Sequence, residues 1–346
     1  MASTPSSAPS WHKIQIPRPL QRLFDRFPLR TYEPNDLPQR SQQLTSSDVA
    51  TLYVFSTDED ARIGAPSFNP GCLKWQTLLR LTNLQFRILP STNHASPTGS
   101  LPFLLPPRTS SSPTSSSPPI PADKLLSYAA QKSTTTTNSP SPTTTTTTAK
   151  PPSPKKSEAY SSLITLSLRN AWLHALYLDR SRTALLRALY IAPCSSSRAV
   201  QTALLYQLRR AAAEQILSSS GTTKVGTAVG GAGGSSSADA IDEEGVYAEA
   251  WDALCALASL LAESETGWFF GAEKPGTFDA SLFAYTHLMM EYMPEGSSTE
   301  EGEGGRMALG AMVRKAGNGE LARHRERVLQ AAWPGWEGRR EGVESS

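Results

Sequence analysis

The sequence predicts a small α/β domain followed by a larger all-α domain, with low-complexity insertions in the loops. Three observations lead to this fold class. Short β-branched and aromatic runs alternate with one helical pattern in the first half. Apolar residues recur at three- and four-residue spacing through the second half, and tracts of Ser, Thr, Pro or Gly interrupt both halves. Without these tracts, about 250 of the residues remain able to fold, which fits two small domains or one two-part body.

Composition predicts where these domains begin and end. We expect an N-terminal arm over residues 1–45, the α/β domain over 46–131, a disordered linker over 132–157, the helical domain over 158–336 and a tail over 337–346. The low-complexity tracts offer too little apolar surface to offset the loss of chain entropy on folding. Further disordered segments are therefore expected within the domains, namely an insert at about 107–120 and loops at about 218–241 and 295–305.

The overall charge and the scattered cysteines and histidines exclude several classes of protein. A net charge of +2 argues against a nucleic-acid binder. No run approaches the roughly eighteen consecutive apolar residues of a membrane-spanning helix. Cys72, Cys194 and Cys255 lie far apart, which is neither a disulfide framework nor a zinc motif and favours a reducing compartment. The five histidines show no metal-ligand spacing, so we predict structural or surface roles and no metal site.

The N-terminal arm is basic and carries one short apolar stripe. Residues 1–30 resemble a matrix-targeting presequence, but three prolines leave room only for a helix over about 20–27. Apolar residues recur within it at i, i+3, i+4 and i+7, with arginines on the opposite side. Three interpretations stay open: an arm packed on its own domain, a docking arm for a partner or an anionic membrane surface, and a cleavable targeting segment. The candidate partner-binding residues are Arg18, Leu20, Arg22, Leu23, Phe24, Arg26 and Phe27.

The first folded segment has the pattern strand, helix, strand, strand. Residues 49–55 (VATLYVF) and 85–89 (QFRIL) have strand composition. Residues 58–70 are expected to form a loop, and 71–81 have helical spacing. Residues 101–105 (LPFLL) form a third, short strand that opens with a proline. This order is typical of a thioredoxin-like βαβ unit, whose crossover is right-handed.

Two further features complete this domain. The proline that opens the third strand of a thioredoxin-like fold is usually cis, so we expect a cis Leu101–Pro102 bond and a structural role for Pro102. Residues 121–131 begin with capping chemistry and place Leu125 and Ala129 at i and i+4, which predicts the last helix of the domain. Ser/Thr/Pro sequence replaces the fourth-strand region, so no fourth strand is predicted.

Cys72 stands where this fold places its chemistry, at the N-terminal turn of the first helix. The helix dipole there can lower the pKa of a thiol, but no second cysteine lies three residues away. A glutathione-binding enzyme also needs an acidic residue followed by serine after the cis-proline strand, and residues 104–109 read LLPPRT instead. We therefore predict a buried, inert thiol, no catalytic residue and no cofactor.

The second half is predicted to be all-helical. Helical spacing of apolar residues covers 158–179, 182–191, 199–217 and 243–262. Residues 280–293 are apolar on nearly every side, so this helix should be central and buried. A methionine-rich binding groove is the alternative interpretation of this helix. The expected core stripe consists of Phe278, Leu282, Tyr285 and Met289.

Two stretches and the arm resemble a known family. The run FFGAEKPGTFDASLFAY (269–285), in which Asp279 opens the buried helix, resembles the C-terminal signature of metaxins, relatives of glutathione S-transferases that have lost the enzyme. The resemblance implies a structural role for Asp279. Gly276 stands where the family has Ser or Thr, which puts the reciprocal capping box in question. Residues 66–107 resemble metaxin-type N-terminal domains, and 20–28 are similar to the arm of a fungal metaxin-like subunit of the mitochondrial sorting and assembly machinery.

This resemblance implies a thioredoxin-like domain followed by an all-α domain of the glutathione S-transferase type, peripheral on the cytosolic face of the mitochondrial outer membrane. It implies a protein without enzymatic activity or cofactor that assists recognition, folding and insertion of β-barrel precursors. The implied partners are a membrane β-barrel subunit, a second metaxin-like subunit, incoming precursors and the membrane surface, with no nucleic acid.

The residues alone leave two other functions and one local question open. The chain could be a thiol-dependent transferase that uses Cys72, or a matrix protein whose first residues are removed on import. Near the C-terminus, the segment WPGW (333–336) holds two indoles. These either pack on the helical domain or belong to an interface.

Overall fold

The computed structural model describes five stretches of the chain, residues 49–107, 118–136, 154–219, 241–294 and 307–336. By contacts, the chain divides into two compact units, residues 1–44 and 45–346. The predicted arm and tail, and most of the predicted linker and disordered segments, lie outside the described residues. All described residues belong to the second unit, and the domain boundaries expected within it stay predictions.

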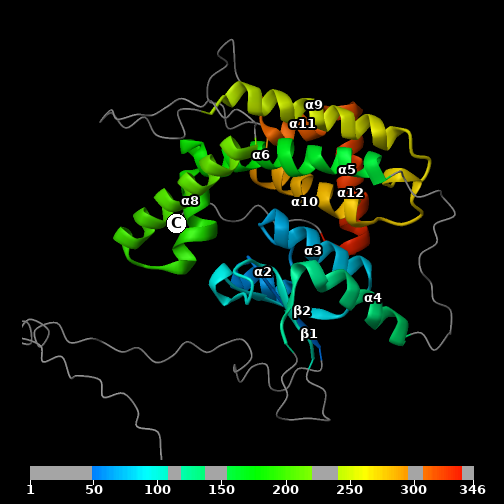
Figure 1. Cartoon of the computed structure of the whole chain (residues 1–346), viewed down its shortest axis with the longest axis horizontal. Coiled ribbons are helices and arrows are strands. Elements are labelled where there is room, and N and C mark those ends of the chain that lie inside the picture. The colour runs from blue at the N-terminus through cyan, green and yellow to red at the C-terminus, as the bar shows by residue number, and fades with distance from the viewer. Residues whose placement is uncertain (1–48, 108–117, 137–153, 220–240, 295–306, 337–346) are drawn as a thin grey trace, which may run out of the picture. The chain divides into compact units, whose positions relative to one another are not determined.

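A four-stranded mixed sheet forms the first part of the described structure (Figure 1). β1 (Ala50–Val54) runs parallel to β2 (Phe86–Pro90), and β3 (Phe103–Leu105) runs antiparallel to β1, in the order β2-β1-β3-β4. All five residues of β1 are buried, because this strand has a neighbour on each side. The three strands expected from the sequence are therefore present, close to their expected bounds.

The expectation that the fourth strand is missing is wrong. β4 (Ile120–Pro121) pairs antiparallel with β3, placing Ile120 opposite Leu104 and Pro121 opposite Phe103. Two residues among prolines carry no strand pattern, so no local signal indicated this element. Inserting residues between two strands adds only slowly to the entropy cost of bringing them together, so the Ser/Thr/Pro tract does not prevent the pairing.

A short helix, α2 (Asp58–Ile63), replaces the loop expected over 58–70. The hydroxyl of Thr57 accepts a hydrogen bond from the amide of Asp60, which caps the first turn. Gly64 ends the helix in the left-handed conformation, with φ of 69°. Six residues are too few to show an apolar period, but these capping residues were visible in the sequence.

The helix α3 (Pro70–Leu81) follows and matches its prediction to within one residue. Its N-cap is Asn69, whose side-chain oxygen accepts from the amide of Cys72 at 3.1 Å. The Leu101–Pro102 bond is cis, which confirms the expectation. After β4, a single 3₁₀ turn leads into α4 (Leu125–Thr136), where Leu125 and Ala129 are buried.

The helical part begins with one continuous helical run where one long helix was expected. α5 (Pro154–Ser162) and α6 (Arg169–Leu173) are joined by the π-helical segment η4 (Leu163–Leu168), and a second π-helical segment, η5 (His174–Leu178), follows. Trp172, at the centre of this run, is almost completely buried.

A compact group of short helices leads from this run to a long helix (Figure 1). η6 (Arg180–Arg182), α7 (Thr183–Leu186), η7 (Arg187–Ile191) and η8 (Ala192–Cys194) follow one another almost without interruption. α8 (Arg198–Ser219) then packs against η5, η7 and α6. Its buried residues are Leu205, Ala212, Ala213 and Ile216.

The helix α9 (Glu243–Ala262) meets the length and composition of a membrane-spanning helix, which the sequence reading did not expect. Half of its most apolar window is buried inside the protein. It packs against η4, against the 3₁₀ segment η11 (Ala316–Gly319) and against α12 (Glu320–Ala332), and it carries Glu249 and Asp252. Core helices of soluble proteins share this length and composition, so these two features alone do not make α9 a membrane span.

The helix α10 (Thr277–Tyr292) is the central buried helix that the sequence predicted. It packs against α3 from the first part and against α11 (Leu309–Lys315) and α12 (Glu320–Ala332). Met289 is fully buried in the core, so it lines no open groove. The helices α11 and α12 were not predicted, although α12 has clear amphipathic spacing.

Candidate functional site

The thiol of Cys72 is sealed inside the protein at the start of α3. The residue has no exposed surface, and burial raises the pKa of the thiol to about 12. Hydrogen bonds with the Phe55 backbone and the Ser67 side chain lower this pKa only in part. Desolvation therefore outweighs these hydrogen bonds, and the thiol stays protonated at neutral pH.

A tyrosine from the helical part closes this region from the other side. The side-chain amide of Asn69 donates a hydrogen bond to the hydroxyl of Tyr190 at 3.1 Å. The ring centroid of Tyr190 lies 5.2 Å from that of Phe55 and 5.1 Å from that of Phe68, and Tyr177 packs on its other side at 5.8 Å. The place where the fold puts a reactive thiol is thus filled by aromatic rings.

This burial predicts how the three cysteines react. With Ellman's reagent at pH 8, we expect exposed Cys194 to react first and half-buried Cys255 more slowly. A variant with Cys194→Ser and Cys255→Ser leaves Cys72 alone, and its reaction should be about a thousandfold slower than that of a free thiol, given the raised pKa. Denaturant should restore full reactivity. Rapid reaction of Cys72 in the folded variant would contradict the sealed site.

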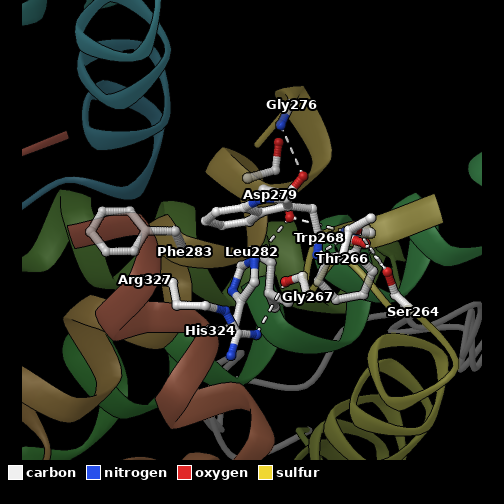
Figure 2. A network of polar contacts seen from close by, with 12 residues as sticks. Ser264, Thr266, Gly267, Trp268, Gly276, Asp279, Leu282, Phe283, His324 and Arg327 are labelled. Carbon is white, nitrogen blue, oxygen red and sulfur yellow. Dashed lines mark hydrogen bonds and ion pairs between the residues drawn. The ribbon is translucent and has the colours of Figure 1, made fainter. Parts of the chain in front are cut away.

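The strongest polar network joins the start of α10 to α12 and to the turn that precedes α10 (Figure 2). Asp279 is almost completely buried and accepts three hydrogen bonds. The donors are the amide of Gly276 at 2.9 Å, the amide of Phe269 at 3.2 Å and Nε2 of His324 at 2.9 Å. Glycine has no side chain to return a bond, so only the carboxylate half of the capping box exists. Gly276 therefore prevents the reciprocal capping box, as the sequence indicated.

His324 completes this network from α12. The ring is fully buried and lies edge-on to Phe269, with centroids 5.3 Å apart, and to Trp268, at 6.0 Å. Among the described residues, its Nδ1 atom has no hydrogen-bond partner. The same part of the chain contains no group of three His, Cys, Asp or Glu side chains that could hold a metal. The network therefore has a structural role: it connects the start of α10, the turn that precedes α10 and α12.

The C-terminal end of α12 is held against the first part of the protein by Trp333. Its indole Nε1 donates to the carbonyl of Gly64 at 2.9 Å, and its ring stacks on Phe283 of α10 with centroids 5.9 Å apart. The guanidinium of Arg80 lies 4.9 Å from the indole centroid and also donates to Gly64 at 2.7 Å. Trp333 thus packs on the helical part, and in addition contacts the sheet part, which the sequence did not predict.

The predicted partner-binding residues of the arm, from Arg18 to Phe27, lie outside the described residues. The structure therefore does not place them relative to Cys72 or Asp279. The sequence indicated Cys72 through its position at a helix start and Asp279 through the resemblance to the metaxin signature. It did not single out His324, Tyr190 or Arg80, because only tertiary contacts give these side chains a role.

Three family models match the chain. The model of the glutathione S-transferase N-terminal domain matches residues 70–182, and that of the glutathione S-transferase C-terminal domain matches 250–328. The model of SAM35, a subunit of the SAM complex, matches 14–75, which covers most of the arm, β1, α2 and the start of α3. A search of curated proteins returned no match to the chain.

Proposed function

We propose a function for this chain from its family: it is a metaxin-like protein with a glutathione S-transferase-like fold and a SAM35-type N-terminal segment. We propose that it acts as a peripheral subunit on the cytosolic face of the mitochondrial outer membrane. The chain has a role in the sorting and assembly machinery, together with the other subunits of that complex, and is associated with the outer membrane. Within this role, we propose that it assists recognition, folding and insertion of β-barrel precursors.

One observation carries this proposal: the SAM35-type segment continues directly into the body of the fold. That segment ends at residue 75, inside α3, so it includes Cys72 and the strand β1. Burial has taken this thiol out of contact with solvent and has raised its pKa. This supports a binding function for the body over a thiol-transfer reaction.

The physical task of such a subunit is to protect unpaired strands. A β-barrel precursor arrives with strands whose backbone N–H and C=O groups have no partners, and such edges tend to aggregate. A protein seated beside the membrane barrel can hold such a segment until it pairs with the edge of the barrel. We propose that the arm attaches this chain to the barrel subunit, and that the second metaxin-like subunit binds in the same complex.

The test removes the apolar stripe of the arm from the full-length chain. Replacing Leu20, Leu23, Phe24 and Phe27 with alanine should reduce recovery of the β-barrel subunit with the tagged chain from mitochondria by about tenfold or more, because clustered apolar anchors dominate such interfaces. The control replaces Leu37 and Leu44, apolar arm residues outside the stripe, and should leave recovery unchanged.

The same purification tests the wider proposal. Alkaline extraction should release the chain from the membrane or leave it held only through its partners, as expected of a peripheral subunit. Failure to recover any β-barrel protein with the unmodified chain would contradict the proposed function. Equal recovery with the stripe variant and the control would contradict only the role of the arm.

A further inference from the structure

The helical part separates its charges along the sequence. Residues 154–219 contain nine Lys and Arg against three Asp and Glu, whereas residues 241–294 contain one Lys against ten Asp and Glu. The net charge of the whole chain, +2, hides this separation. The cations are concentrated in the segment that contains η6, α7, η7 and α8, and this segment therefore has a positive field.

Three arginines of this segment lie close together in space. Arg209 of α8 donates hydrogen bonds to the carbonyl of Tyr177 at 3.0 Å and to the hydroxyl of Thr183 at 2.7 Å, which fix its position beside η5 and α7. Burial lowers the pKa of Arg209, and the positive charges of Arg180 and Arg187 lower it further. The hydroxyl of Thr183 donates in turn to the carbonyl of Arg180 at 2.6 Å, and Arg187 follows Thr183 by about one helical turn, so Thr183 joins the three arginines.

The acidic side chains nearby do not neutralise this group. Asp179 is close enough to raise the pKa of Arg209 in part, but its carboxylate caps η6 by accepting from the amide and the hydroxyl of Ser181. Arg180 and Arg187 are exposed, and no carboxylate of the described stretches lies within ion-pair distance of either. Their charges are therefore available to a partner.

Two large side chains of α8, the helix that carries Arg209, face solvent. Tyr206 lies three residues before Arg209 and is 66% exposed, although it is a large aromatic residue. Val200, one turn and a half earlier on α8, is 45% exposed. In Figure 1, α8 extends away from α9 and α12, and it packs against η5, η7 and α6. We call Arg180, Arg187, Arg209 and Tyr206 the α8 basic patch.

We propose that the α8 basic patch docks on an anionic membrane surface. Cations near such a surface bind it through its negative potential, and an exposed tyrosine inserts its ring at the level of the headgroups. The α8 basic patch combines separated positive charges with one exposed aromatic ring. A lipid surface can bind such a patch, because lipid headgroups do not require a shaped pocket. The inference rests on the proposed peripheral placement at the outer membrane, and it assigns which side of the chain faces the lipid.

The test measures sedimentation of the full-length chain with lipid vesicles. Vesicles of phosphatidylcholine with about 30% phosphatidylinositol should bind the chain, whereas pure phosphatidylcholine should not. Raising the salt from about 50 to 300 mM should weaken the binding, since it shortens the range of the surface potential. The double variant Arg180→Gln/Arg187→Gln should bind about thirtyfold more weakly, as expected for the loss of two cations near the surface.

The matched control removes two exposed cations from other parts of the fold. Lys274→Gln/Lys315→Gln changes the net charge equally but lies outside the patch, so it should retain most of the vesicle binding. Tyr206→Ser should weaken binding even at low salt, because the aromatic anchor is lost. Circular dichroism of each variant establishes that it folds.

Three results would overturn this inference. Equal binding to neutral and anionic vesicles would mean that charge is not recognised. Equal losses in the variant and the control would mean that the patch is not specific. Absence of vesicle binding, with loss of another protein from purifications of the Arg180/Arg187 variant, would mean that an acidic protein covers the patch. If the variant still recovers the β-barrel subunit, the proposed function stands whichever way the vesicles behave.

Discussion

Replacing Asp279 with alanine is expected to lower the free energy of unfolding by about 3–5 kcal/mol, because the change leaves three donors, two of them buried, without their acceptor. These donors are the amides of Gly276 and Phe269 and Nε2 of His324. They come from three separate segments, so the carboxylate holds the start of α10, the preceding turn and α12 in register. Loss of a single contact at the surface would cost far less.

A second variant separates the carboxylate from its shape. Asp279→Asn keeps the volume but supplies one oxygen and one NH₂ group in place of two oxygens. The NH₂ group must then face a donor, so we expect a loss of about 2–3 kcal/mol, between that of alanine and none.

Urea unfolding followed by circular dichroism measures both changes. The control is Asp252→Ala on the exposed side of α9, which should change the free energy of unfolding by less than about 0.5 kcal/mol. If Asp279→Ala behaved like this control, the network would not have the structural role that its geometry indicates.

Replacing Trp333 with alanine is expected to cost about 3–5 kcal/mol, the usual range for removing a buried tryptophan. The indole is 4% exposed, stacks on Phe283 and donates to the carbonyl of Gly64. The change also removes the aromatic face over which the guanidinium of Arg80 lies. Because these partners belong to both the sheet part and the helical part, the loss should weaken the contact between them.

Trp336 is the natural control, since it lies in the same WPGW segment. It packs on the core only in part, so Trp336→Ala should cost about 1 kcal/mol or less. Thermal unfolding of the two variants, side by side, measures the difference. Hydrogen exchange should increase in α3 and α12 only for Trp333→Ala. Equal destabilisation by the two changes would contradict the role assigned to Trp333.

The sequence was most informative where periodicity was long. The helices over 70–81, 198–219, 243–262 and 277–292 show apolar spacing over several turns, and the structure has each of them near its expected bounds. Short elements were missed for the opposite reason. The six residues of α2 and the two of β4 are too few to show a period, and their formation depends on a cap or on pairing with β3.

The candidate site also has features that the sequence indicates and features that only the tertiary structure shows. Cys72 could be recognised from the sequence because it stands at the start of a helix, where backbone amides and the dipole give a side chain a defined task. Asp279 was indicated by the resemblance to the metaxin signature, in which it opens the buried helix. The pKa of Cys72 could not be anticipated, since the helix dipole and desolvation act in opposite directions. Only the tertiary structure shows that Cys72 is fully buried, and this burial raises the pKa of the thiol despite the hydrogen bonds with Phe55 and Ser67.

By itself, the sequence determined the two-part fold class, the low-complexity insertions and the resemblance of the arm, because these follow from composition, local spacing and contiguous motifs. The tertiary structure alone decided which side chains act together. His324 meets Asp279 across 45 residues, Trp333 reaches Gly64 across 269, and Arg209 lies beside Thr183 across 26. Such contacts join segments with no shared periodicity, so they arise only when burial of the apolar faces has brought those segments together.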